Sequence, residues 1–260
     1  MLPFINLGFI KIPLYGLCIV LGIFSGAFIV FRGCKKKGKD FYSFIIIAAL
    51  VTFFSFIGAK LLFLVITYPL KDIPKIIFYM LFKPKQTQLG EGFVFYGGLI
   101  FGCFGYFLGS LISKCKINYF FEELTFLIPW CHAFGRLGCF CGGCCYGILY
   151  DGPFAVYYHN PITNVPPDTG IFPVQLLESL LMFIFALIMI FRYFKGKKVS
   201  VIFYVLYYSV TRFFLEYLRG DAERKIYGAF STSQWISIFL FVLACGVLVF
   251  MIFRKRKNKN

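Results

Sequence analysis

Acidic residues and histidine are scarce in this sequence. It has 11 aspartates and glutamates against 27 lysines and arginines, and only two histidines, while charged residues make up 15% of the chain. The basic residues sit in short loops and a tail, so there is no soluble basic domain and a nucleic-acid partner is excluded. The first hydrophobic segment lacks a basic n-region and a small-residue cleavage site, which argues against a cleaved signal peptide.

Long hydrophobic segments fill most of the chain. Hydrophobic residues make up 60% of it, with 37 phenylalanines and 17 tyrosines, and the mean hydropathy is +0.80. Apolar windows long enough to cross a bilayer recur, so we expect an all-α polytopic membrane protein forming one integral membrane domain over residues 1–260. Seven transmembrane helices are predicted, at about residues 12–31, 41–68, 93–112, 119–138, 172–192, 199–218 and 234–253. A short interfacial helix is predicted within Lys71–Lys85.

The lysines and arginines are unevenly divided between the two sides of this arrangement. Sixteen fall in the loops of one side and in the tail at residues 254–260, and eight fall on the other side. The positive-inside rule then places the N-terminus outside and the basic tail in the cytoplasm. The connection at residues 138–171, which contains no lysine or arginine, is predicted to be an outward-facing loop or small subdomain.

A cysteine- and glycine-rich stretch, Cys131–Gly147, follows the apolar part of the fourth segment. It contains one histidine, His132, and a lone arginine, Arg136, in apolar surroundings. Its many glycines are expected to break the helix beyond Arg136, and such backbone at membrane depth must line protein or a wet cavity. An intramembrane arginine indicates a functional site, whereas the alternative is a re-entrant loop whose arginine reaches lipid phosphates.

A second set of charges lies at the end of the sixth segment. Arg212, Glu216 and Arg219 are spaced four and three residues apart, which places them on one helix face. With Arg136 they would gather cations near one leaflet, and the arginine fork suits a phosphate of a lipid headgroup. An interhelical ion pair is the alternative. Gln175 and Glu178 approach from the same side, either as members of the site or as helix-packing groups.

Six short motifs occur along the chain in the same order as in one known protein family. They are LYGLCIVLG at Leu14–Gly22, FYGGLIFG at Phe95–Gly102, HAFGRLG at His132–Gly138, PVQLLE at Pro173–Glu178, TRFFLEYLRGD at Thr211–Asp221 and STSQWIS at Ser231–Ser237. With them the sequence resembles the prolipoprotein diacylglyceryl transferase family over nearly its whole length.

The resemblance implies a reaction and a set of partners. A diacylglyceryl group leaves phosphatidylglycerol and becomes thioether-linked to the lipobox cysteine of a preprolipoprotein signal peptide, with glycerol phosphate released. The reaction takes place in the bacterial plasma (inner) membrane, among membrane lipid and without metal or soluble cofactor. The implied catalytic residues are Arg136, Arg212, Glu216, Tyr96 and Tyr15. The implied substrate-binding residues are Arg136, Arg219, Gly97, Gly98, Gly147, Gln175 and Glu178.

The sequence also departs from the family pattern. Tyr96 stands where many members have histidine, Cys139 where the signature has asparagine, and Cys144 where a glutamate is common. Histidine accepts a proton readily near neutral pH, whereas tyrosine has a reference pKa of about 10. Phe172 and Leu177 replace two further residues of the pattern. The chain is therefore interpreted as a divergent branch.

Four cysteines support other interpretations. Cys139, Cys141, Cys144 and Cys145 have spacings that elsewhere indicate zinc or redox chemistry. A membrane thiol oxidase using the Cys139–Cys145 cluster is one alternative, but no quinone-site signature accompanies it. A non-catalytic lipid- or lipoprotein-binding relative is the other. On an outer face we expect a structural disulfide among these cysteines, with a connectivity that sequence does not give.

Overall fold

The chain folds into helices that are long and apolar. The computed structural model describes residues 4–6, 11–82, 94–159, 165–220 and 226–257. The described chain divides into two compact units, one within residues 1–33 and 121–260 and the other within residues 34–120. Six of the described helices have the length and hydropathy needed to cross a membrane. The protein is therefore a mostly helical, multi-pass membrane protein.

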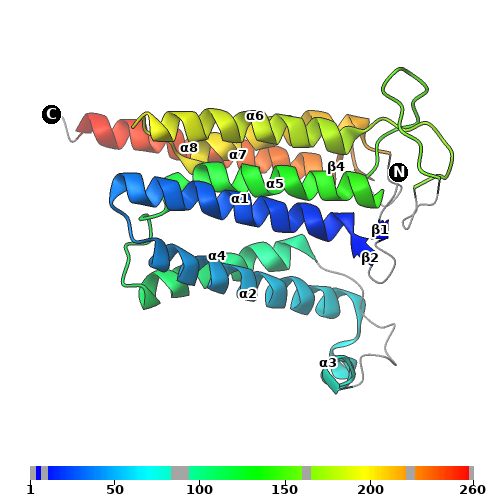
Figure 1. Ribbon diagram of the computed structural model, residues 1–260, viewed down its shortest axis with the longest axis horizontal. Coiled ribbons are helices and arrows are strands. Elements are labelled where there is room, and N and C mark those ends of the chain that lie inside the picture. Colours follow the sequence, from blue (N-terminus) through cyan, green and yellow to red (C-terminus); the bar gives the residue numbers. More distant parts are fainter. Residues whose placement is uncertain (1–3, 7–10, 83–93, 160–164, 221–225, 258–260) are drawn as a thin grey trace. The chain divides into compact units, whose positions relative to one another are not determined.

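The first unit is a bundle of parallel and antiparallel helices (Figure 1). α5 (Phe121–Gly142) packs on α6 (Val174–Phe194), and α7 (Val201–Leu215) packs on both α6 and α8 (Thr232–Lys257). The other side of α5 contacts α1 (Leu14–Lys37), where the Trp130 indole donates a hydrogen bond to Ser25 Oγ over 2.9 Å. A Cβ on Gly22 of α1 would lie 2.6 Å from Cβ of Phe134, so glycine allows this close approach.

A short β-hairpin directly precedes each of two helices of this unit, α1 and α8. β1 (Phe4–Asn6) pairs antiparallel with β2 (Lys11–Pro13), which leads directly into α1. β3 (Ile226–Tyr227) pairs with β4 (Phe230–Ser231) around Gly228, whose φ is +66°, and leads into α8. A 3-10 turn, η3 (Glu216–Leu218), continues α7. The hairpin brings polar residues at the start of α8 toward the end of α7.

The second unit is built on two packed helices. α2 (Phe41–Thr67) begins at Asp40, whose carboxylate accepts hydrogen bonds from the backbone N–H groups of Tyr42 and Ser43. The Ser43 hydroxyl also donates to this carboxylate over 2.6 Å, and that bond, followed by the two backbone bonds, lowers the pKa of Asp40. α2 packs on α4 (Phe95–Ile112), and a Cβ on Gly97 would lie 2.2 Å from the Gly58 carbonyl oxygen. In chain order, η1 (Leu70–Asp72) and α3 (Ile73–Phe82) come between α2 and α4.

The predicted segments fall on described helices but differ from them in their limits. The segment predicted over residues 93–112 forms α4, whose stretch Gly97–Ile112 is a shorter apolar helix than the six candidate spans. α3 supplies the short helix predicted within Lys71–Lys85. α8 continues to Lys257, so most of the described basic tail is helical and extends the last hydrophobic segment.

Candidate active site

The helix that carries Arg136 continues past it. The prediction that glycines break this helix is wrong, because α5 runs to Gly142 through Gly135 and Gly138 and also contains Pro129. Packing offsets the weak helix propensity of glycine here: a Cβ on Gly138 would lie 2.9 Å from Tyr15 Cδ2. The backbone turns only afterwards, at Gly143 with a φ of +73°. Arg136 is thus held on a regular, packed helix.

Glu178 is the centre of a buried charge cluster. Its Oε2 lies 3.0 Å from Arg136 Nε and 3.9 Å from Arg212 Nη1. Its Oε1 lies 3.3 Å from His132 Nε2. The side chain is 2% exposed. One carboxylate of α6 therefore joins cationic or polar groups from α5 and α7, and Glu178 belongs to the candidate site as well as to the helix packing.

Arg212 connects this centre to the hairpin before α8. Its Nη2 lies 2.9 Å from Glu216 Oε2 and donates to Ser233 Oγ over 3.2 Å. Ser231 Oγ donates to the other Glu216 oxygen over 2.8 Å. Arg212 Nη1 is buried and has no hydrogen-bond partner among the described residues. The spacing of four residues correctly predicted the Arg212–Glu216 pair, and the arginine keeps one donor for another acceptor.

Two tyrosines of α7 line the histidine side of the cluster. His132 Nδ1 lies 3.3 Å from the Tyr204 hydroxyl, and the His132 ring lies edge-on to Tyr208, with ring centroids 5.0 Å apart. Tyr204, Tyr208 and Arg212 are four residues apart along α7, so they share one face. This spacing was the signal in the sequence that could have identified both tyrosines.

Arg219 and Gly147 meet beside the loop that connects α5 and α6. Arg219 follows η3 in an extended conformation and forms an isolated antiparallel bridge with Gly147. A Cβ on Gly147 would lie 2.2 Å from the Phe172 carbonyl oxygen and 3.0 Å from that of Leu218. Because α7 ends at Leu215, Arg219 does not continue the helical ladder predicted with Arg212 and Glu216. Glycine is required at position 147 for this close backbone approach.

The loop after α5 carries a small apolar core of its own. Tyr158, Val165 and Ile171 are buried together, and the Tyr158 hydroxyl donates to the Phe140 carbonyl over 2.9 Å. Burial raises the pKa of Tyr158. Gln175, at the start of α6, donates to the Cys144 carbonyl over 3.0 Å. Gln175 therefore fixes the loop backbone beside α5.

Of the remaining predicted residues, Tyr15 belongs to the first unit, where it interacts electrostatically with Arg136, and the others belong to the second. Tyr15, in the first turn of α1, packs on Gly138 and is 44% exposed. Tyr96, Gly97 and Gly98 begin α4 of the second unit. There Gly97 approaches the Gly58 backbone, and a Cβ on Gly98 would lie 3.3 Å from the Ser55 carbonyl oxygen. These two glycines allow α2 and α4 to pack closely.

The cysteines are arranged differently from the predicted pairing. All ten are free thiols, so the disulfide expected on the outer face is not formed. The sulfurs of Cys139, Cys144 and Cys145 lie within 4.8 Å of one another. Cys141 interacts instead with Cys18 of α1. The C-x2-C pair of Cys141 and Cys144, on which a thiol oxidase would depend, is therefore divided between two neighbourhoods.

Fold and site together define a class: a multi-pass helical membrane protein with a buried arginine–carboxylate cluster beside the loop between α5 and α6. Residues 3–250 match the family model for prolipoprotein diacylglyceryl transferase. The chain belongs to this family, a family of transferases of lipoprotein biosynthesis, and the resemblance noted in its sequence is confirmed.

Named relatives align along almost their full length. The chain is 30% identical over 252 residues to the phosphatidylglycerol–prolipoprotein diacylglyceryl transferase of Clostridium tetani, covering 96% of each protein. It is 29% identical over 257 residues to transferase 2 of Clostridium perfringens, covering 96% of this chain and 94% of the relative. A Dehalococcoides mccartyi transferase is 25% identical over 262 residues. The similarity therefore spans both units.

Proposed function

We propose that this protein transfers the diacylglyceryl group of phosphatidylglycerol to the thiol of the lipobox cysteine of a preprolipoprotein. The observation that carries the proposal is the buried cluster in which Glu178 and Glu216 hold Arg136 and Arg212. Buried charges are costly in a membrane protein and mark sites of function. Here they occur in a member of a family whose relatives bear the name of this reaction.

The proposed placement in the membrane follows from charge and helix length. α4 would supply the seventh span beside the six longer helices. The N-terminus would face outward and the C-terminal end of α8 the cytoplasm, since basic residues concentrate at the ends predicted to be cytoplasmic. The outer loop between α5 and α6 would then face the periplasm or the exterior of a bacterial plasma (inner) membrane. The candidate site would lie in the outer half of the bilayer.

The arginines supply donors that a phosphate can use. Arg136 meets Glu178 through Nε, a contact that does not use the fork formed by its two terminal nitrogens. Arg212 Nη1 is buried, lies 3.9 Å from Glu178 Oε2 and makes no hydrogen bond among the described residues. Arg219 would be a third arginine near an anionic headgroup. Charge-assisted bonds of this kind strengthen as negative charge grows on the leaving phosphate.

An apolar groove lies beside Arg212 on the bundle surface. It has a volume of about 210 Å³ and is lined from α7 and α8 by Ser209, Val210, Phe213, Phe214, Ser237, Ile238 and Phe241. Ser233, which binds Arg212, stands one turn before Ser237 on α8. A lipid whose phosphate meets the arginines could therefore lay part of an acyl chain in this groove, and we propose that it does.

The reaction itself needs a thiolate and a stabilised leaving group. The acceptor cysteine loses its proton to a base, because the thiolate is the nucleophile. Its sulfur attacks the glycerol carbon that bears the phosphate ester, a C–S bond forms and the C–O bond breaks. Glycerol phosphate leaves with the electron pair, and the arginines neutralise its growing charge. We also propose the roles that the sequence resemblance implies: catalysis for Tyr15 and Tyr96, and substrate binding for Gly97, Gly98, Gly147 and Gln175.

The proposal is tested with purified protein in detergent. Phosphatidylglycerol carrying labelled acyl chains is incubated with a lipobox peptide, and the product is identified by mass spectrometry as a thioether that resists hydroxylamine. We expect product with phosphatidylglycerol and none with a peptide whose lipobox cysteine is replaced by serine. Folded protein that binds the lipid but forms no thioether would contradict the proposal and favour a non-catalytic lipid-binding protein.

A further inference from the structure

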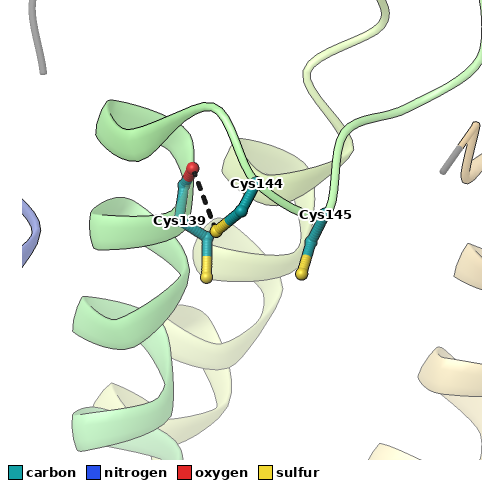
Figure 2. Close-up of side chains that lie close together, drawn as sticks. All are labelled: Cys139, Cys144 and Cys145. Atoms are coloured by element: carbon teal, nitrogen blue, oxygen red, sulfur yellow. Dashed lines mark hydrogen bonds between the residues drawn. The ribbon is translucent and has the colours of Figure 1, made fainter. Parts of the chain in front are cut away.

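Three sulfur atoms converge where α5 ends. Cys139 lies on the last turns of the helix, and Cys144 and Cys145 lie on the loop that follows (Figure 2). Their Sγ atoms all lie within 4.8 Å of one another, and none is part of a disulfide. The Cys144 thiol also donates to the Cys139 carbonyl over 3.8 Å. Figure 2 shows the three side chains directed into one region between helix and loop.

The spacing of these sulfurs suits coordination of one ion. A zinc–sulfur bond is about 2.3 Å long, so tetrahedral ligands stand about 3.8 Å apart and trigonal ones about 4.0 Å apart. Small side-chain rotations would bring the three sulfurs from their present separations to either arrangement. Thiolate ligands select soft or borderline cations such as Cu⁺ and Zn²⁺ over Mg²⁺ or Ca²⁺.

The surrounding charge suits a complex of three thiolates. Zn²⁺ with three thiolates has a net charge of −1, and Cu⁺ with three has −2. Arg136 and Arg219 both interact electrostatically with Cys145, and Arg136 also does so with Cys139. An anionic metal–thiolate centre would therefore have cations beside it, which offsets the cost of placing its charge in a partly buried site.

We propose that Cys139, Cys144 and Cys145 form a binding site for a thiophilic cation, Zn²⁺ or Cu⁺. Three thiols release their protons and three metal–sulfur bonds form. The site ties the loop that leads to Gly147 to the end of the helix that carries Arg136. Binding would therefore stabilise the backbone around both residues. The site is independent of the proposed transferase reaction.

The first test titrates anaerobically reduced protein in detergent with Cd²⁺, whose thiolate complexes absorb in the ultraviolet. We expect a sulfur-to-cadmium charge-transfer band that saturates at one equivalent. The band is lost in the variant Cys139→Ser/Cys144→Ser/Cys145→Ser and retained in Cys103→Ser/Cys115→Ser/Cys245→Ser, which removes the same number of thiols elsewhere. An equal band in both variants, or no band in the unaltered protein, would overturn the proposal.

A second measurement needs no variant, so misfolding cannot obscure it. The reduced protein is alkylated with iodoacetamide in detergent, alone or with Zn²⁺ or Cu⁺, and the modified peptides are quantified. Either metal is expected to slow alkylation of the three cysteines about tenfold or more, because a coordinated thiolate is withdrawn as a nucleophile. Protection by only one metal identifies the cation. Equal alkylation in all three samples overturns the proposal, as does a disulfide among the three cysteines in protein taken directly from native membranes.

Discussion

Glu178 holds the Arg136 guanidinium from the neighbouring helix, with 3.0 Å between Oε2 and Nε. The same oxygen lies 3.9 Å from Arg212 Nη1, so one carboxylate sets the positions of two arginines on two other helices. The relationship explains why charges can be buried in this bundle. It also makes Glu178 the residue on which the geometry of the proposed site depends.

The first prediction concerns that carboxylate. Glu178→Gln should lower the rate of transfer at least about a hundredfold, because Arg136 and Arg212 lose their shared partner and turn toward other acceptors. The rate is measured as labelled thioether formed per minute. Glu123→Gln is the matched control: it alters another buried carboxylate, whose partner is the Tyr193 hydroxyl, and should lower thermal stability but leave transfer intact. Equal losses of transfer in both variants would contradict the role given to Glu178.

The second prediction concerns the shape of the Arg212 side chain. The planar guanidinium of Arg212 contacts Glu216, Ser233 and Glu178 at once. Arg212→Lys keeps the charge, but a single ammonium group cannot make all three contacts. Transfer should fall about tenfold or more, because one charge-assisted hydrogen bond contributes about 1.5–3 kcal/mol. The kcat/KM for phosphatidylglycerol measures the effect. A lysine variant with unchanged kcat/KM would show that charge alone suffices.

The third prediction concerns the serine that orients Glu216. Ser231→Ala removes the hydroxyl that donates to the Glu216 carboxylate and should reduce transfer about tenfold or more, the effect of one hydrogen bond to a charged group. Ser110→Ala is the control, since that buried hydroxyl of α4 donates to the carbonyl of Tyr106 one turn earlier in its own helix. Ser231→Thr keeps a hydroxyl and should restore most of the activity. Failure of threonine to restore activity, with alanine and threonine variants equally folded, would argue against this orienting role.

The fourth prediction compares two glycines. Gly147→Ala places a methyl group 2.2 Å from the Phe172 carbonyl oxygen, so the bridge to Arg219 should open and transfer should be lost. Gly135→Ala meets nothing within 4 Å and lies inside α5. It should be active and more stable by about 0.5–1 kcal/mol, because alanine favours a helix. Thermal unfolding and the transfer assay are carried out on both variants. A fully active Gly147→Ala protein would show that the close backbone approach at Gly147 is not needed for transfer.

The fifth prediction tests the groove between α7 and α8. Ile238→Trp fills part of it and should raise the KM for phosphatidylglycerol with long acyl chains more than for short-chain phosphatidylglycerol. Val242→Trp, one turn further along α8 and 63% exposed, adds the same bulk outside the groove lining and serves as the control. If both tryptophan variants have the same KM at every chain length, the groove does not hold an acyl chain.

Spacing within a helix predicted the local parts of this site. Four-residue spacing gave the Arg212–Glu216 pair, and apolar runs predicted seven spans, six of which coincide with described helices long and apolar enough to cross a membrane. Sequence could not show that Glu178 meets arginines from two other helices, because that depends on the rotation of three packed helices. It also predicted a break after Arg136, since glycine is a poor helix former in isolation. Contacts with Tyr15 and α1 offset that preference.

The contacts made by the hairpin before α8 also could not be predicted from the sequence. Ser231 and Ser233 are in the STSQ motif noted in the sequence, but only the β3–β4 turn places them against Glu216 and Arg212. The clustering of Cys139 with Cys144 and Cys145, and not of Cys141 with Cys144, likewise depends on where α5 ends. Motif order identified the family, whereas the partners of each polar side chain required the fold.

If the arginine–carboxylate cluster performs diacylglyceryl transfer, transfer must depend on its arginines. The rate of thioether formation from phosphatidylglycerol is measured for the unaltered protein and for Arg136→Gln, Arg212→Gln and Arg192→Gln. Arg192 lies near the far end of α6 and binds the Lys198 carbonyl, so it controls for loss of an arginine. We predict full activity for Arg192→Gln and a loss of at least about a hundredfold for the other two folded variants. Near-normal transfer by folded Arg136→Gln and Arg212→Gln would contradict the account.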